Sequence, residues 1–291
     1  MNSTFKKIAL AVCLGAGLVG VGYYIGQGKQ DPTPEPVAQN TPAPEKPLVT
    51  PIEAPQAEGI QEPEEPKVIP MASTLPLESM TGLTVRSVAD FEIFKSDTPS
   101  LEIVGDSQEL IDSIKTEMVG PNLIVSHVLT KTIKAKCGNM SVTVEPNGNT
   151  MTMNVNNGAK TEKSHCALVK IGVKKIPAIQ LEESGNVHFS GADEQQLLLK
   201  IAGSGNISGE GKVDDLLLWI SGSGNIDTAD VQVRKLTVLS EGSGNVNASV
   251  YGKLQSALSG SGNVNIFGNP TSSQHEENGS GKFRLFSAPS K

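Results

Sequence analysis

Aromatic residues are scarce in this sequence and make up only 4% of its 291 positions, with seven Phe, three Tyr and one Trp. Large rings supply much of the volume of an ordinary globular core, so their scarcity argues against a thick, rounded domain. The apolar fraction is nevertheless 37%. This composition is typical of a narrow core filled by Val, Ile and Leu.

Long runs of basic residues are also missing. The net charge is −7, and the pairs Lys6-Lys7 and Lys174-Lys175 belong to no larger basic block. Because a nucleic-acid backbone attracts clusters of Lys and Arg, the sequence predicts no nucleic-acid partner.

The patterns that usually mark chemistry are absent as well. No Cys-x-x-Cys and no pair of histidines at ligand spacing occurs, so we expect no metal and no other cofactor. None of the four histidines stands in a motif with a nucleophilic Ser or Cys: His127, His165, His188 and His275. The sequence therefore predicts no catalytic residue.

Three cysteines are present. Cys13 lies in an apolar N-terminal stretch, whereas Cys137 and Cys166 flank the segment just before the repeats described below. In an oxidising compartment these two would form a disulfide that closes a loop of about 30 residues and contributes about 3 kcal/mol. Two free buried thiols are the alternative interpretation.

Residues 1–30 have the pattern of a membrane anchor or signal segment. Lys6 and Lys7 precede an uncharged apolar stretch at residues 8–25, which is close to the shortest length that spans a bilayer. No Ala-x-Ala site follows, which favours an uncleaved anchor. We expect a single-pass inner-membrane protein of a bacterium, with its C-terminal domain in the periplasm or outside the cell.

Residues 31–82 are typical of an extended linker. Residues 31–70 hold eleven of the eighteen prolines, with glutamates between them. Such a segment buries no core and repels itself, so it would hold a domain away from the membrane. We expect that domain at residues 83–286 and a short tail at 287–291.

The tetrapeptide Ser-Gly-Asn followed by Val or Ile occurs five times between residues 184 and 264. Its glycines stand at 185, 205, 224, 244 and 262, in steps of 20, 19, 20 and 18 residues. A repeat of this length indicates a solenoid.

Apolar residues alternate with other residues on both sides of each corner. Around Gly205, for example, Leu197, Leu199 and Ile207 stand eight and six before and two after the glycine. This period of two is that of a β-strand. We therefore predict an all-β fold, a right-handed parallel β-helix with coils of about 20 residues.

The segment before the repeats adds one predicted helix to this β pattern. Residues 106–118 carry Leu110, Ile111 and Ile114 at helical spacing after a capping Asp106. Strands are expected at 85–94, 100–104 and 122–128, and a hairpin at 141–144 and 150–155.

We interpret the corner residues as structural. Gly and Asn both tolerate positive φ, and Ser bonds its own backbone, which suits a tight turn. In stacked coils, the corner asparagines would form a ladder of side-chain amides: Asn186, Asn206, Asn225, Asn245 and Asn263.

The whole order resembles a known family. A strand region (DFEIFKSDTPSLEIVGD), a short helix, strands near NLIVSHV and VKIGVKKIPAIQLEESGNV, the Ser-Gly-Asn coils and a final Gly279-Ser280-Gly281-Lys282 are similar to the putative auto-transporter adhesin, head GIN domain family. This resemblance covers roughly residues 84–286 and implies an exported β-helix without established catalytic residues. The segment between Cys137 and Cys166, the anchor and the long linker depart from the family pattern.

One column of outward positions is apolar. If the residues eight and six before each glycine point inward, the residues seven and five before it point outward, and several of these are large and apolar: Leu198, Leu217, Trp219 and Leu239. Such a stripe is rarely left bare, so we expect it to pack against another subunit or against residues 84–130. A sugar stacked on Trp219 is the alternative.

These observations lead to three functional hypotheses. The first is a non-enzymatic envelope domain for binding, adhesion or assembly, with a protein partner or a second copy of the chain. The second is a pectinase-like carbohydrate enzyme, since Glu194 and Asp214 both stand nine residues after a corner glycine and would share a register. The third is a structural spacer across the periplasm.

Overall fold

The computed structural model describes residues 67–70, 75–105, 107–128, 132–137, 140–144, 151–155 and 167–287. The expected membrane span at residues 8–25, most of the linker, Cys13, Cys166 and the residues after 287 lie outside these ranges. Within them, no helix is both long and apolar enough to cross a membrane.

The described elements are almost all strands. They are β1 (Lys67–Pro70), η1 (Leu77–Ser79), β2 (Gly82–Arg86), β3 (Asp90–Lys95), β4 (Ser100–Gly105), α2 (Gln108–Ser113), β5 (Ile114–Val119), β6 (Asn122–His127), β7 (Ile133–Cys137), β8 (Met140–Val144), β9 (Met151–Val155), β10 (Ala167–Val173), β11 (Ala178–Leu181), β12 (Val187–Ile201), β13 (Ile207–Ile220), β14 (Ile226–Ser240), β15 (Val246–Ser249), β16 (Lys253–Leu258), β17 (Val264–Phe267), β18 (Ser272–Glu277) and β19 (Phe283–Phe286).

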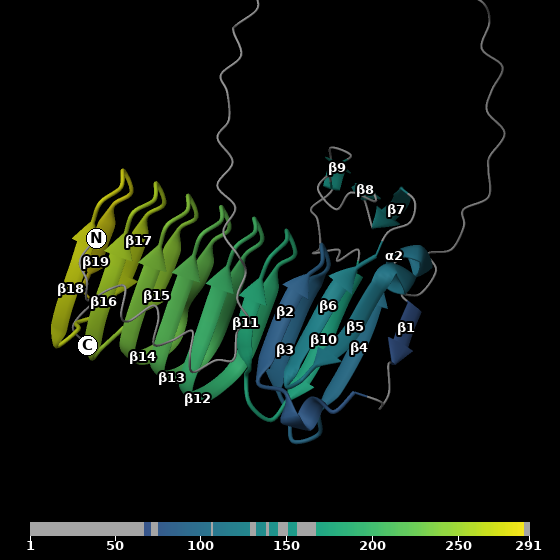
Figure 1. Ribbon diagram of the computed structural model, residues 1–291, viewed down its shortest axis with the longest axis horizontal. Coiled ribbons are helices and arrows are strands. Elements are labelled where there is room, and N and C mark those ends of the chain that lie inside the picture. The colour runs from purple at the N-terminus through teal and green to yellow at the C-terminus, as the bar shows by residue number, and fades with distance from the viewer. Residues whose placement is uncertain are drawn as a thin grey trace, which may run out of the picture. The chain divides into compact units, whose positions relative to one another are not determined.

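The repeats form a β-solenoid of about five turns. The long strands β12, β13 and β14 pair in parallel, each along its first half and again along its second half. The first halves continue into β15, β17 and β19, and the second halves into β16 and β18. Figure 1 shows these strands side by side, with the Ser-Gly-Asn corners in a row along one edge. The parallel stacking and the coil length agree with the prediction, whereas the right-handed winding stays a prediction.

The first halves of the long strands and their continuations form one sheet of the solenoid, and the second halves and their continuations form the other. The core is a set of stacked aliphatic columns between these two sheets. Leu199, Leu218 and Val238 are each 0% exposed and stand opposite one another in register. On the other side of the corner, Ile207, Ile226 and Val246 form a second fully buried column. The alternating pattern of the sequence therefore located the inward positions correctly.

The corner glycines serve close stacking of the backbone. A Cβ on Gly224 would overlap the carbonyl oxygen of Gly205, and one on Gly244 would overlap that of Gly224. The described glycines with positive φ are instead Gly120, Gly191, Gly211 and Gly268. The expectation that the motif glycines supply positive φ is therefore wrong, because what they provide is the absence of a side chain.

The segment before the repeats extends both sheets of the solenoid. β2 pairs in parallel with β11 and β6, and β3 pairs in parallel with β12 and β10. Beyond these strands the direction changes, since β5 runs antiparallel to β6, and β4 antiparallel to β10. Strands β2 to β6 thus continue the sheets edge to edge, so the expectation that this segment covers the apolar stripe is wrong.

Two local expectations in this segment are corrected. The helix spans only Gln108–Ser113, with Ser107 in place of Asp106 as its N-cap, and Ile114 begins a strand. The expected strand at 85–94 is broken into β2 and β3, since Ser87 to Ala89 leave the sheet, where the Ala89 N–H donates to the Ser87 hydroxyl. The helical spacing covers only residues 110–114 and indicates a weak helix preference. The pairing of β5 with β6 overrides this preference, so the chain becomes a strand from Ile114.

Strands β7, β8 and β9 form a separate antiparallel sheet. β8 and β9 correspond to the predicted hairpin, with Val144 opposite Met151. Cys137 ends β7, but its predicted partner Cys166 lies outside the described residues, so the disulfide stays a prediction.

Candidate functional site

The outer surface of the sheet formed by the second halves of the long strands carries the predicted apolar side chains. Leu198 stands opposite Leu217, and Trp219 opposite Leu239, in two adjacent columns. All four side chains are partly exposed, whereas their neighbours along each strand are buried. We call Leu198, Leu217, Trp219 and Leu239 the apolar face.

Trp219 has a neighbour on one side of its ring. Lys200, its partner in register on β12, places its Nζ 4.6 Å from the ring centroid. This cation–π contact occupies the surface of the indole that a sugar would need for stacking. The Trp219 Nε1 is shielded from solvent and has no hydrogen-bond partner in the described structure. The arrangement therefore favours apolar packing over glycan recognition.

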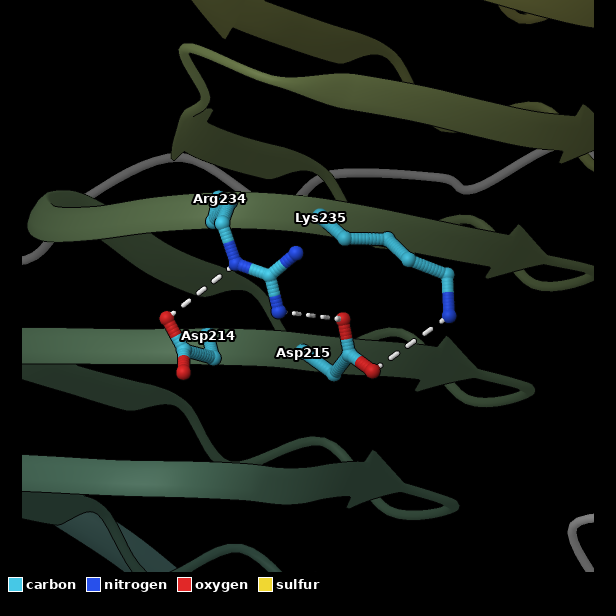
Figure 2. Close-up of polar contacts among 4 residues, drawn as sticks. All are labelled: Asp214, Asp215, Arg234 and Lys235. Atoms are coloured by element: carbon cyan, nitrogen blue, oxygen red, sulfur yellow. Dashed lines mark hydrogen bonds and ion pairs between the residues drawn. The ribbon is translucent and has the colours of Figure 1, made fainter.

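A cluster of opposite charges, shown in Figure 2, lies next to the apolar face, since Asp215 is two residues before Leu217 in β13. The Arg234 Nε donates to the Asp214 carboxylate at 3.2 Å, and the Lys235 Nζ lies 3.4 Å from the Asp215 carboxylate. An Arg234 Nη also approaches Asp215 at 3.9 Å. Two acids and two bases neutralise one another on an exposed edge, which forms a polar rim and adds little stability.

Glu194 and Asp214 do not meet in register, so this expectation is wrong. Glu194 stands opposite Val213 and accepts a hydrogen bond from the Ile176 N–H at 2.9 Å. The cause is a register shift between Phe189 and Ala192, which takes up one residue of the longer coil. Counting forward from the preceding glycine passes through this bulge and misplaces every later position by one. The enzyme hypothesis loses its supporting pair of carboxylates.

The corner asparagines form a continuous hydrogen-bonded ladder. The side-chain oxygen of each of the first four accepts from both the backbone N–H and the side-chain amide of the next asparagine; for Asn225 these donors are Asn245 N at 2.9 Å and Nδ2 at 3.0 Å. The same pattern repeats along the whole set: Asn186, Asn206, Asn225, Asn245 and Asn263. The ladder is a scaffold that ties the coils together.

Charged residues stand at both ends of this ladder, and the sequence analysis missed them. At the first end, the backbone N–H and the amide of Asn186 donate to the Asp90 carboxylate. At the last end, the Asn263 oxygen accepts only the backbone N–H of Lys282, at 3.2 Å. The donor end of the ladder thus meets an anion, as is favourable at the N-terminus of a helix, whereas its acceptor end meets a backbone N–H. Asp90 gave no signal because it is 96 residues from Asn186.

His127 is the second group that the sequence analysis missed. Its Nδ1 lies 3.0 Å from the Ser87 hydroxyl and its Nε2 lies 2.7 Å from the Ser113 hydroxyl. Because Ser113 donates its own proton to the Leu110 carbonyl, it accepts from Nε2–H, and Ser87 donates to Nδ1. Burial lowers the pKa of His127 to about 4. Ser87 is 0% exposed, and the two contacts of His127 join β6 to α2 and to the residue that follows β2.

No group of three or more metal-ligating side chains occurs in the described ranges. The structural arrangement that remains as a candidate site is the apolar face with its polar rim.

The chain is similar in fold to solved structures of bacterial proteins. It is similar to the crystal structure of a putative adhesin from Bacteroides fragilis, with 17% identity and a TM-score of 0.52, over 78% of this chain and all of the other. A structure named as a putative lipid binding protein, from Parabacteroides distasonis, has 20% identity and a TM-score of 0.38, over 76% of this chain and 97% of the other. A putative adhesin from Parabacteroides merdae has 17% identity and a TM-score of 0.38, over 76% and 95%.

No curated protein matches the chain in sequence. The model of one family, however, matches residues 79–270, which contain the corner asparagines and the apolar face. The chain belongs to this family, described as "Putative auto-transporter adhesin, head GIN domain".

Proposed function

We propose that this chain is a non-enzymatic β-helix domain that binds another protein at the bacterial cell envelope through its apolar face. The observation that carries the proposal is the alignment of Leu198, Leu217, Trp219 and Leu239 on one outer surface. An apolar centre bordered by paired charges is the usual anatomy of a protein interface. Trp at such a centre is also the residue type most often found to dominate binding energy.

A protein fits this surface better than a polysaccharide does. Sugar binding usually needs an open aromatic surface together with polar groups that point at the hydroxyls. Here Lys200 lies over the Trp219 ring, and the other members of the face are leucines. The nearby carboxylates of Asp214 and Asp215 are already engaged by Arg234 and Lys235.

The family supports an adhesive role outside the cytoplasm. In our proposal, residues 8–25 anchor the chain in the inner membrane, and the Pro/Glu-rich segment that follows presents the solenoid to its partner. The acidic, proline-rich composition of that segment is the supporting observation.

Site-specific photo-crosslinking in intact cells tests the proposal. A benzoylphenylalanine at Leu217 is expected to form a covalent adduct with a protein. The same group at Asp227, an exposed residue of β14 on the other sheet, is expected to form none. Replacing Trp219 with Glu should remove the Leu217 adduct, because a buried unpaired charge at the interface is costly.

Gln255→Glu is the matched control, since it adds the same charge at a polar position of the same sheet. Equal adducts from the Leu217 and Asp227 positions would contradict the proposal. The proposal would also be contradicted if the Trp219→Glu variant still formed the Leu217 adduct and had an unchanged mass in solution and an unchanged melting temperature.

A further inference from the structure

The C-terminal end of the solenoid differs from its N-terminal end. At the N-terminal end, the outermost strands β1 and β5 also have a single strand partner each within the described residues, but both run antiparallel to that partner, and helix α2 adds the buried Leu110 and Ile111. At the C-terminal end, β18 pairs only with β16, and β19 pairs only with β17, within the described residues. The outer edges of β18 and β19 therefore leave a row of backbone donors and acceptors without a strand partner.

Core positions are uncovered at this end. Leu285 stands in the column of Ala248 and Ile266, which are both 0% exposed, yet Leu285 is 45% exposed. Beside it, the rings of His275 and Phe283 stack at 4.5 Å, both at inward positions of their strands. We call His275, Phe283 and Leu285 the terminal platform. It lies at the C-terminal end of the stack, with the apolar side chains Phe283 and Leu285 on β19 and the imidazole of His275 on β18.

Aromatic residues concentrate around this platform in a chain that has few of them. Three of the seven phenylalanines are Phe267, Phe283 and Phe286. The Phe267 and Phe286 rings stack at 5.2 Å, and Phe286 is 43% exposed. Exposed aromatics at an open strand edge are characteristic of surfaces that bind protein.

The two edge strands carry opposite charges. β18 ends with Glu276 and Glu277, whereas Lys282 and Arg284 belong to the corner and to β19. Glu276 and Arg284 both stand at outward positions, because the residues beside them in each strand occupy core columns. If a second chain laid its own β18 and β19 against these strands in the opposite direction, a basic residue would face an acidic one at both strands.

We propose that the terminal platform is a tail-to-tail interface with a second copy of this chain. A twofold axis through the corner at Gly279–Gly281 would lay β18 of one copy antiparallel over β19 of the other, twice by symmetry. This arrangement satisfies the open edges, covers Leu285 and Phe283, and pairs Glu276 with Arg284 across the interface. Because both copies use the same surface around one twofold axis, the association closes as a dimer and does not continue as a fibre.

One coil end is smaller than a standard stable interface, so we expect a dissociation constant on the order of 10 μM. Light scattering of the full chain in a mild detergent, over a range of concentrations, measures the dimer. Leu285→Lys is expected to abolish it. Glu276→Arg and Arg284→Glu are each expected to weaken it at least about tenfold, because each replaces two attractive pairs with two repulsive ones.

The double variant Glu276→Arg/Arg284→Glu restores the pairing with the charges exchanged, so its affinity should return to within about threefold of the original. This recovery also shows that neither single change acts by unfolding the last coil. A chain that is monomeric at every concentration overturns the proposal, as does a dimer that ignores Leu285→Lys and both charge reversals, or a double variant without recovery. Trp219→Glu should leave this dimer intact, which separates it from binding through the apolar face.

Discussion

The asparagine ladder predicts that a single exposed amide stabilises the solenoid well above the usual surface effect. Replacing Asn225 with Ala removes three hydrogen bonds: its own Nδ2 to Asn206 at 2.9 Å, and the two bonds that its oxygen accepts from Asn245. Each such bond contributes about 0.5–1.5 kcal/mol, and the lower part of this range suits an exposed site. We therefore expect Asn225→Ala to lower the free energy of unfolding by about 2 kcal/mol, against about 0.5 kcal/mol or less for an ordinary surface change.

Two companion variants test whether the ladder is responsible. Asn263→Ala removes only two bonds, the Nδ2 bond to Asn245 and the bond from the Lys282 N–H, both at 3.2 Å, so its loss should be smaller. Ser223→Ala is the matched control, because this exposed residue is next to the ladder and its hydroxyl forms no hydrogen bond in the described structure. Its effect should lie within about 0.5 kcal/mol of zero.

Asn225→Asp separates the donor from the acceptor. A carboxylate still accepts from Asn245 but faces the Asn206 oxygen at the former 2.9 Å donor position, so two acceptors meet. We expect a loss of stability at neutral pH that is partly recovered once the new carboxyl is protonated and donates. Urea unfolding followed by far-ultraviolet circular dichroism measures all four variants. Equal stabilities for Asn225→Ala and Ser223→Ala would refute the reasoning.

Two further predictions concern the corners and the buried imidazole. Gly224→Ala should destabilise the chain by at least about 3 kcal/mol in the same urea assay, because its Cβ would overlap the Gly205 carbonyl and separate two coils. Ser223→Ala serves again as the control. A loss of stability below about 1 kcal/mol for Gly224→Ala would contradict close stacking of the corners. For His127, the pKa is about 4 in the folded chain and 6.5 as the ordinary value. The unfolded chain therefore takes up the proton first, and stability falls by up to about 3 kcal/mol as pH drops from 6.5 towards 4. His127→Gln should lose this component, and parallel pH profiles of both proteins would show that His127 is not its source.

The sequence predicted correctly those features that repeat from one coil to the next. The inward columns through Leu199 and Ile207, the corner asparagines and the outward position of Trp219 all follow from a period near 20 and strand alternation. These features are repeated, so each coil reinforces the same signal. The segment before the repeats has no such redundancy, and there the helix and the break between β2 and β3 were misjudged.

Long-range partners were beyond reach for a different reason. Nothing close in the sequence relates Asp90 to Asn186 or Ser87 to His127, since both pairs are created only when β2 and β3 join the stack. The register of Glu194 was also not predictable from the sequence. A coil of 20 residues here pairs with a coil of 19 residues, and the register depends on where the longer coil places its extra residue. Backbone pairing decides that position, and the residue types around the bulge do not reveal it.

The direction of the ladder bears on whether the terminal platform is a true end. Each amide oxygen needs a following asparagine to supply two donors, and Lys282 supplies only its backbone N–H and has no side-chain oxygen for a further coil. In the same coil, Ser273, His275 and Glu277 occupy columns that hold Leu254, Ser256 and Leu258 one coil earlier. Glu277 also turns back to accept from the Phe283 N–H at 2.8 Å. Two independent features, the end of the amide ladder and the polar residues at the inward positions of β18, therefore stop the stack at the same coil, as terminal repeats of solenoids do. Capping is incomplete on the β19 side, where Leu285 and Phe286 remain exposed, and in the proposed dimer β18 of the second copy would cover this side.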